Sequence, residues 1–341
     1  MTRASDRKNA HLDLARNRAA QSLTSNGFDR ITLCHNALPE CDADAIDLSC
    51  HFLSKKLSMP LMIGAMTGGT DRADAINRCL AEAAQKAGIA FAVGSQRASI
   101  EGNRDQSELR DLAPDIPIIA NLGGAQLRRD DGLDLAQQAV ESLSADALAI
   151  HLNPLQEVAQ PEGDRNWIGV EAAIAKAVDL FDCPIIVKEV GAGISASVAA
   201  RLHALGVRYL DVAGLGGTNW TRIETQRHDD GQNPVMTPFL DWGIDTCNAL
   251  LTIAQSVPQA RMIASGGIRH GLDAAKGIWL GAEMVAAAGH FLRSVEDDQG
   301  TLTPDRLDEA LEIWRQQMQI ALFLTGSSNL KHFRNAEGII A

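Results

Sequence analysis

Short apolar runs alternate with longer amphipathic stretches along the chain from Pro60 onward. Within each run the apolar residues are consecutive, which is typical of strands buried on both faces of a parallel sheet. The runs cover residues 61–65, 89–93, 116–120, 147–152, 185–187, 209–213, 262–264 and 284–288. Because strands alternate with helices through eight units, the pattern predicts an α/β fold of the (β/α)8 TIM-barrel type. An open, doubly wound sheet is the alternative.

The stretches between the runs have helical spacing. Ile76, Leu80, Ala84 and Ala87 share one face of a predicted helix, and charged residues occupy its other faces. A second apolar stripe, in residues 307–324, consists of Leu311, Trp314, Met318 and Leu322. Both patterns predict helices that pack on a sheet through one face.

We divide the chain into an N-terminal extension, residues 1–59, and a barrel, residues 60–341. Two polar stretches, 94–114 and 221–240, are long enough to be functional loops rather than simple connections. Both follow predicted strands, so in a barrel both lie at the catalytic end.

Composition narrows the classes of function. The net charge of −12 argues against nucleic acid or an anionic membrane as a partner. Aromatic residues make up only 4%, so the core must consist mainly of Ala, Leu, Ile and Val. The 6 Cys residues are scattered without a CxxC pair, which is typical of free thiols in a reducing cytosol. We find no signal peptide and no apolar run of about 18 residues, and therefore expect a cytoplasmic protein without a membrane span.

Two glycine turns follow the last two predicted strands. The first is Ser265-Gly266-Gly267-Ile268-Arg269 and the second is Ala288-Gly289. In barrels the loops after strands seven and eight often bind phosphate through backbone N–H groups, and glycine lets an anion approach closely. Two such turns at these places favour a phosphate site over two ordinary strand-to-helix turns.

A second glycine-rich segment competes with this interpretation. Residues 191–196 match the dinucleotide-binding pattern GxGxxA, and Asp211 follows about 20 residues later, as that pattern requires. However, the preceding strand ends in charged residues, Lys188 and Glu189, and several strand–helix units precede it. We therefore rank a Rossmann site below the phosphate turns. The P-loop pattern is absent from the sequence.

Polar residues follow six of the predicted strands. They are Thr67, Ser95, Gln96, Arg97, Asn121, His151, Asn153, Lys188, Thr218 and Asn219. In a barrel these positions meet at one mouth, where buried polar groups need partners. A flavin would supply ring carbonyls, a ring N–H and a phosphate. Individually each residue has a structural explanation, such as a helix cap for Thr67 or an ion pair with Glu189 for Lys188.

The end of the fourth predicted strand gives the sharpest signal. His151 and Asn153 share one face of the strand, and Gln156 and Glu157 follow a proline. Ligand binding is favoured over a satisfied core histidine with a capping asparagine. Glu157 is a lone carboxylate that either binds Mg²⁺ with help from ligand phosphates or is simply solvated.

Near the N-terminus, Arg7, Lys8 and His11 form a small basic group. Arg7 and His11 have the i, i+4 spacing of helix neighbours. A solvated helix turn explains them, and so does a basic arm that closes over a diphosphate.

Taken in order, these segments resemble the type 2 isopentenyl diphosphate isomerases. The resemblance covers nearly the whole chain, although 101–115 and 225–240 cannot be aligned and their roles stay open. It rests on Arg7-Lys8 with His11, Met66-Thr67-Gly68-Gly69, Gly94-Ser95-Gln96-Arg97, Asn121-Leu122-Gly123, His151-Leu152-Asn153-Pro154-Leu155-Gln156-Glu157, Gln160-Pro161-Glu162-Gly163-Asp164, Val187-Lys188-Glu189-Val190-Gly191, Gly217-Thr218-Asn219-Trp220 with Glu224, Ser265-Gly266-Gly267, and Ala288-Gly289-His290-Phe291.

The resemblance implies an FMN barrel that interconverts isopentenyl and dimethylallyl diphosphate, with FMN reduced, NADPH as the usual reductant, and Mg²⁺. It implies that FMN is held by Ala65, Met66, Thr67, Ser95, Asn121, Lys188, Thr218, Gly266, Gly267, Ile268, Arg269, Ala288 and Gly289. Substrate would be held by Arg7, Lys8, His11, Ser95, Gln96, Arg97, His151, Asn153 and Gln156, and Mg²⁺ by Glu157. The candidate catalytic residues are His151, Asn153, Gln156, Lys188, Trp220 and Glu224.

The reaction moves a double bond by adding one proton and removing another, yet no close pair of carboxylates stands out for this work. The lack of a carboxylate pair is explained if reduced FMN transfers the protons, with Lys188 stabilising the negative charge of the reduced flavin ring. Whether Gln156 or the flavin removes the second proton stays open.

Two other functions remain as alternatives. One is an FMN-dependent oxidoreductase of 2-hydroxy acids, with His270 as base and Arg269 on the carboxylate. The other is a non-catalytic flavin- or phosphate-binding module. We also expect a homo-oligomer, a tetramer or an octamer, as the resemblance suggests.

Overall fold

The computed structural model describes residues 3–229 and 233–341, and eight parallel strands form a closed barrel within it. Around the barrel the order is β10-β11-β4-β5-β6-β7-β8-β9, so every strand pairs with its neighbours in sequence. The strands are β4 (Leu61–Ile63), β5 (Ala90–Ala92), β6 (Ile118–Gly123), β7 (Ala147–His151), β8 (Ile185–Lys188), β9 (Tyr209–Asp211), β10 (Arg261–Ala264) and β11 (Met284–Ala287). The predicted TIM barrel is confirmed, and the open sheet is wrong.

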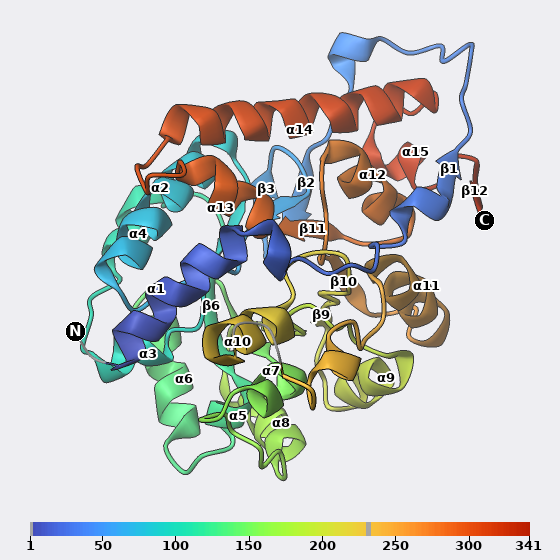
Figure 1. Ribbon diagram of the computed structural model, residues 1–341. Coiled ribbons are helices and arrows are strands. Elements are labelled where there is room, and N and C mark those ends of the chain that lie inside the picture. The colour runs from blue at the N-terminus through green and yellow to red at the C-terminus, as the bar shows by residue number, and fades with distance from the viewer. Residues whose placement is uncertain (1–2, 230–232) are drawn as a thin grey trace.

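Helices surround the barrel (Figure 1). They are α2 (Asp71–Ala87), α3 (Arg97–Glu101), α4 (Glu108–Leu112), α5 (Gly124–Leu127), α6 (Gly132–Glu141), α7 (Pro154–Ala159), α8 (Val170–Leu180), α9 (Ala196–Ala204), α10 (Trp220–Asp229), α11 (Thr246–Ser256), α12 (Gly271–Trp279), α13 (Gly289–Val295), α14 (Pro304–Leu324) and α15 (Leu330–Phe333). The apolar stripes predicted for α2 and α14 face the core, with Ile76, Leu80 and Trp314 almost fully buried.

The two polar stretches predicted as long loops contain short helices. Residues 94–114 form α3 and α4, and the described part of 221–240 forms most of α10 and a short 3-10 helix, η4 (Thr237–Phe239). The expectation of loops was therefore wrong at these positions, because short polar helices of 5 to 10 residues carry too little apolar periodicity to be recognised. Residues 230–232 lie outside the described residues.

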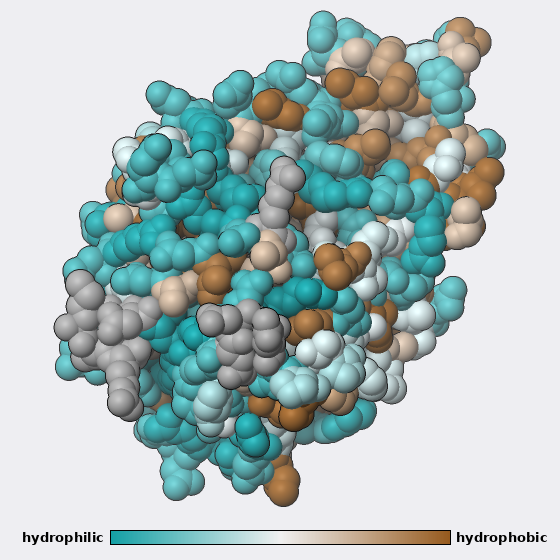
Figure 2. Space-filling model, in the orientation of Figure 1, coloured by the Kyte–Doolittle hydropathy of each residue, from teal (hydrophilic) through white to brown (hydrophobic). Residues whose placement is uncertain are grey.

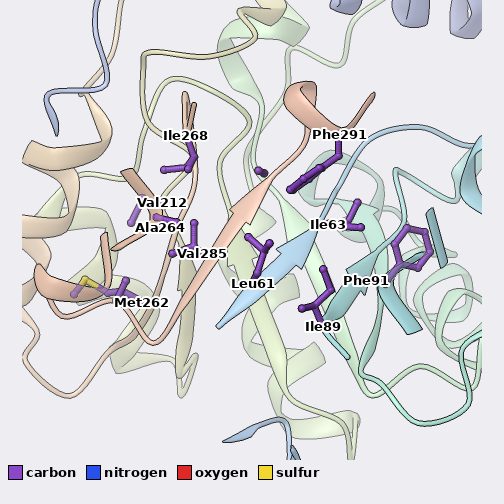
Figure 3. Packing of buried hydrophobic residues seen from close by; sticks show 14 of the residues in the cluster. Leu61, Ile63, Ile89, Phe91, Val212, Met262, Ala264, Ile268, Val285 and Phe291 are labelled. Carbon is purple, nitrogen blue, oxygen red and sulfur yellow. The ribbon is translucent and has the colours of Figure 1, made fainter. Parts of the chain in front are cut away.

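Side chains alternate between two layers along each strand. On β7, Ala147 and Ala149 face the barrel interior, whereas Leu148 and Ile150 pack against the helices. Figure 3 shows residues of the outer layer, including Leu61 of β4 and Val285 of β11. The inner layer also contains Met62, Ile119, Ile186, Ile263 and Met284, so side chains fill the interior of the barrel.

The segment before the barrel packs on it from two sides. It contains α1 (Arg3–Arg16), the 3-10 helices η1 (Arg18–Ala20), η2 (Phe28–Arg30) and η3 (Ala43–Ala45), and the strands β1 (Ile31–Leu33), β2 (Cys50–Phe52) and β3 (Lys55–Leu57). The β2–β3 hairpin closes one end, where Phe52 packs edge-on against Tyr209 with ring centroids 5.6 Å apart. Strand β1 pairs with the C-terminal strand β12 (Gly338–Ile340).

Helix α1 lies at the other end of the barrel, beside α10 and α13 (Figure 1). Its residues Leu12 and Ala15 are buried against the core. The strand ends of the barrel therefore open beneath a helix contributed by the N-terminal segment.

The surface on this face is mostly hydrophilic (Figure 2), in keeping with the net charge of −12. Among the described residues, no helix combines the length and apolar character needed to cross a bilayer.

Candidate functional site

A cavity of about 370 Å³ lies at the carboxyl ends of the strands, beneath α1. It is lined by side chains from all eight strand ends and from α1 itself. The predicted site residues that line it are Arg7, Lys8, His11, Ala65, Met66, Thr67, Ser95, Arg97, Asn121, His151, Asn153, Gln156, Glu157, Lys188, Thr218, Trp220, Gly266, Gly267, Ile268, Arg269, Ala288 and Gly289. Residues up to 286 positions apart in sequence, Arg7 and Arg293, thus line one cavity.

Gln96 is the predicted substrate residue that the structure does not bring into the cavity. It is fully buried, and its Nε2 donates to Gln106 Oε1 at 3.0 Å and to the Ala139 carbonyl at 3.1 Å. Its Oε1 accepts from the Asn121 backbone N–H at 2.9 Å. Ser95 and Arg97 line the cavity, whereas Gln96 does not. Its hydrogen bonds hold the loop after β5 from the side away from the cavity. The structure therefore places the Gln96 side chain outside the cavity, where it supports the loop that carries Ser95 and Arg97.

The floor of the cavity holds a charged group. Lys188 Nζ lies 4.0 Å from Asp211 Oδ2 and donates to the Glu189 carbonyl, and both ends of the ion pair are buried. Ser265 donates to the other oxygen of Asp211. Burial raises the pKa of Asp211, and the nearby Lys188 opposes that shift. An ammonium group is thus held in place at the base of the cavity, paired with Asp211 and not with the Glu189 carboxylate.

His151 is held in one tautomer and is uncharged at neutral pH. Its Nδ1 lies 2.8 Å from Asn121 Oδ1, while Asn121 Nδ2 donates to the Val93 carbonyl at 3.1 Å. Since Asn121 Oδ1 is an acceptor, Nδ1 carries the proton and Nε2 is left as an acceptor. Burial, together with the cations Lys188 and Lys8, lowers the pKa of His151 to about 3.

The amide of Gln156 is fixed at both ends. Asn153 Nδ2 donates to Gln156 Oε1 at 3.0 Å, and Gln156 Nε2 donates to Glu224 Oε1 at 2.9 Å. Asn153 Nδ2 also donates to Glu157 Oε1 at 3.0 Å. Within the described part of the chain, Asn153 Oδ1 is buried without a hydrogen-bond partner, which marks it as a group that a ligand would satisfy.

Glu224 lies behind this array and does not line the cavity. It is fully buried, accepts from Gln160 Nε2 at 2.6 Å and lies 3.0 Å from His11 Nε2. Arg227 Nε donates to its second oxygen at 3.0 Å. Burial alone would raise the pKa of Glu224, but these partners outweigh it and lower the pKa to about 2. A permanent carboxylate therefore orients Gln156 from outside the cavity.

Three cations gather where α1 meets the rim of the cavity: Arg7, Lys8 and Arg97. Burial, and then the charges of Arg7 and Arg97, lowers the pKa of Lys8 to about 8. Arg7 Nη1 lies 3.6 Å from Glu162. Excess positive charge in a buried position is typical of an anion site.

The two glycine turns also line the cavity, after β10 and β11. Gly267 has φ of +69°, and a Cβ there would lie 2.3 Å from the Gly216 carbonyl carbon. Gly289 opens α13, whose first N–H groups have no partner within the helix. Arg269 lines this end, but its guanidinium is paired with Asp273 at 2.7 Å and Asp29 at 2.6 Å.

The Rossmann-like segment 191–196 is not a phosphate site. The backbone N–H groups of Val190, Gly191 and Ala192 all donate to Glu189 Oε2, at 2.6, 2.6 and 2.5 Å. The carboxylate of this chain therefore occupies the position that a phosphate would need. Ser195 then caps α9 by accepting from the Val198 N–H.

Several cavity residues were not among the predicted site residues: Asp211 and Ser265 on the floor, Gln160 beside Glu224, and His290 next to Gly289. A buried acid at the end of an apolar strand was the signal for Asp211. Its partner Ser265 was not predictable, because their pairing depends on β9 and β10 lying side by side.

Within residues 3–229 and 233–341, no group of three His, Cys, Asp or Glu side chains has the arrangement of a metal site. Glu157 lines the cavity and accepts the Asp164 N–H at 2.7 Å.

Comparison with known proteins agrees with this architecture. Residues 136–338 match the model of the FMN-dependent dehydrogenase family. The chain superposes on an active chimera of (S)-mandelate dehydrogenase with a TM-score of 0.69 at 17% identity, covering 98% of each chain. It superposes on mandelate oxidase with (S)-4-hydroxymandelic acid with a TM-score of 0.67 at 14% identity, again covering 98% of each chain. These low identities establish the fold alone.

Curated relatives are far more similar in sequence. Isopentenyl-diphosphate delta-isomerase of Xanthobacter autotrophicus is 47% identical over 336 residues, covering 97% of this chain and 96% of the relative. The enzyme of the same name from Pseudescherichia vulneris is also 47% identical, covering 97% and 95%. The resemblance found in the sequence motifs is confirmed: this chain belongs to the isopentenyl-diphosphate delta-isomerase family, built on an FMN-dependent dehydrogenase barrel.

Proposed function

We propose that the protein interconverts isopentenyl and dimethylallyl diphosphate with reduced FMN as acid–base cofactor and Mg²⁺ on the diphosphate. The observation that carries this proposal is the amide of Gln156, which lines the cavity and is held at both ends by Asn153 and Glu224. The names of the relatives support the substrate class.

The cavity residues fit FMN. The turns at Gly267 and Gly289 leave space where a Cβ would collide with neighbouring backbone or with Thr218, which suits a phosphate held by main-chain N–H groups. Lys188 places a buried positive charge at the base of the cavity, where the ring would lie. Ala65, Met66, Thr67 and Asn121 line the walls beside it.

The cations at the rim fit the substrate diphosphate. Arg7, Lys8 and Arg97 would neutralise most of its charge, and Glu157 would hold Mg²⁺ together with phosphate oxygens and water. His151 offers only a hydrogen bond at neutral pH, because its pKa is near 3. It would therefore orient substrate and not transfer a proton.

Reduced FMN, when bound, supplies the acid–base groups that the protein lacks. The residues of the chain then have supporting roles. Lys188 stabilises negative charge, Trp220 covers the hydrocarbon, and Gln156 presents a carbonyl oxygen and an N–H in a fixed direction. Glu224 contributes by holding Gln156, so its catalytic effect is indirect.

We also propose NADPH as the reductant, a homo-oligomeric assembly, and residues 1–59 as the segment that brings the basic group to the substrate. These proposals follow from the resemblance and from the position of α1 over the cavity.

The decisive experiment is an anaerobic assay of isopentenyl diphosphate with the FMN-loaded protein, Mg²⁺ and dithionite. Dimethylallyl diphosphate should form without net consumption of reductant. Absence of product while FMN is bound would overturn the proposal.

The 2-hydroxy-acid oxidoreductase is not supported by the geometry. His270 Nδ1 accepts the Asp273 N–H at 3.1 Å and caps α12, and Arg269 is committed to Asp29 and Asp273. Stoichiometric oxidation of a 2-hydroxy acid by the FMN-loaded protein would nevertheless favour that function.

A further inference from the structure

Outside the cavity, a charged cluster joins α1 to the barrel. Its members are Arg16 of α1, Arg72 of α2 and Glu296, the residue that ends α13. Arg16 Nη1 donates to Glu296 Oε2 at 2.8 Å, and Arg72 donates to both oxygens of Glu296, at 2.8 and 2.7 Å. None of the three is among the residues that line the cavity.

The cluster has the features of a strong attachment. Glu296 is only 1% exposed, so its negative charge is nearly desolvated and depends on its partners. Two guanidinium groups compensate it, and Asp13 of α1 accepts from Arg72 Nη1 at 2.6 Å. Helix α1 contributes one cation and one anion to the cluster, Arg16 and Asp13, and Arg16 Nη2 also lies 3.7 Å from the exposed Asp298. Arg16 also donates to the backbone carbonyls of Glu296 and Asp297.

This attachment is coupled to the cavity in two ways. Helix α13, whose C-cap residue is Glu296, begins at Gly289 in the second glycine turn. At the other end of α1, Lys8 lies about 12 Å along the helix axis from Arg16, at 1.5 Å per residue. Arg7, Lys8 and His11 reach the cavity from that part of α1. The direction in which these side chains point therefore depends on how the Arg16 end is fixed.

We propose that Arg16, Arg72 and Glu296 are positioning residues for the substrate diphosphate. They fix the C-terminal end of α1 so that Arg7 and Lys8 lie over the cavity before substrate arrives. Without them, closing α1 would cost part of the binding energy of the diphosphate. This inference rests on the proposed role of the basic group as a diphosphate ligand.

The test compares Glu296→Gln and Arg16→Gln in the FMN-loaded protein. Each should raise KM for isopentenyl diphosphate by roughly 10- to 100-fold and leave kcat within about threefold, since the reacting groups are untouched. Amide exchange should increase in residues 7–16 while FMN affinity stays at the wild-type value. Arg16→Lys should recover part of the KM, because lysine keeps the charge but not the forked geometry.

Arg104→Gln is the matched control. Arg104 bridges Asp71 and Asp74 at the start of α2, at 2.8 and 2.7 Å, and these contacts do not involve α1. It should leave KM unchanged. Two results with an active wild-type protein would show that the inference is wrong. In one, both cluster variants have the wild-type KM. In the other, both variants show weaker FMN binding together with a lower kcat. If the wild-type protein itself does not isomerise the substrate, the proposed function fails first.

A double-mutant cycle identifies the route of the effect. If the cluster acts through Arg7, then Arg7→Gln should raise KM strongly in the wild-type protein and little in Arg16→Gln. Fully additive effects of the two substitutions would show that the cluster does not act through the basic group.

Discussion

The side-chain nitrogen of Gln156 lies 2.9 Å from Oε1 of Glu224, and Glu224 itself is wholly buried. A carboxylate accepts but does not donate, so it holds the Gln156 amide with its nitrogen toward α10. The carbonyl oxygen of Gln156 must then face Asn153.

Glu224→Gln removes this constraint, because a glutamine can donate as well as accept and the amides of Gln156 and Gln160 can then turn over. We expect kcat to fall by about 100-fold with FMN affinity unchanged, the range seen when one oriented polar group is lost. Steady-state kinetics and FMN titration measure both. Glu171→Gln, on the outer face of α8 and paired with Arg201, is the control and should have wild-type kcat.

The pKa of Lys8 near 8 predicts a pH dependence of substrate binding. The ammonium form attracts the diphosphate, and in the free protein it loses its proton as pH rises through about 8. KM should therefore be constant below that pH and rise above it.

Lys8→Arg provides the comparison, since arginine stays protonated throughout this range. Its KM should be flat from about pH 7 to pH 9.5. An identical rise in both proteins would assign the titration to another group.

Gly267→Ala should disrupt the first glycine turn. The position has φ of +69°, and the added Cβ would lie 2.4 Å from the Gly216 carbonyl oxygen. Strain of about 1–3 kcal/mol plus the backbone collision should weaken FMN binding by roughly 100-fold. Flavin fluorescence quenching measures the affinity. At Gly169, φ is +89° but nothing lies within 4 Å of the Cβ position, so Gly169→Ala should lower stability slightly and leave FMN binding intact.

Glu157→Gln tests the metal site. Because Glu157 is the single carboxylate proposed to contact Mg²⁺, the Mg²⁺ concentration for half-maximal activity should rise by about 10- to 100-fold. The glutamine amide has nearly the same shape as the carboxylate, and its oxygen can still accept a hydrogen bond from the Asp164 N–H. FMN binding should therefore not change. Chelation by EDTA should abolish wild-type activity, and full activity in its presence would refute a metal role.

The sequence predicted the barrel well because buried parallel strands are continuous apolar runs, and all eight were found within a few residues of their ends. Most of the predicted site residues line the cavity, because strand ends in a barrel converge. It failed for Gln96, since neighbouring residues after a strand point to different sides and only one side is the cavity. It placed Glu224 near the site but did not reveal that Glu224 acts from behind Gln156, a relation made by the packing of α7 against α10.

The carboxylate of Glu189, bound by successive N–H groups of its own loop, also affects selectivity. The mouth of this barrel has more than one concave stretch of backbone with the electrostatics to attract a phosphate. Because the side chain of Glu189 fills one of them, a phosphorylated ligand cannot bind there in a wrong position. The orientation of the cofactor then depends on two features: the glycine turns that can bind its phosphate, and the Glu189 side chain that blocks binding elsewhere.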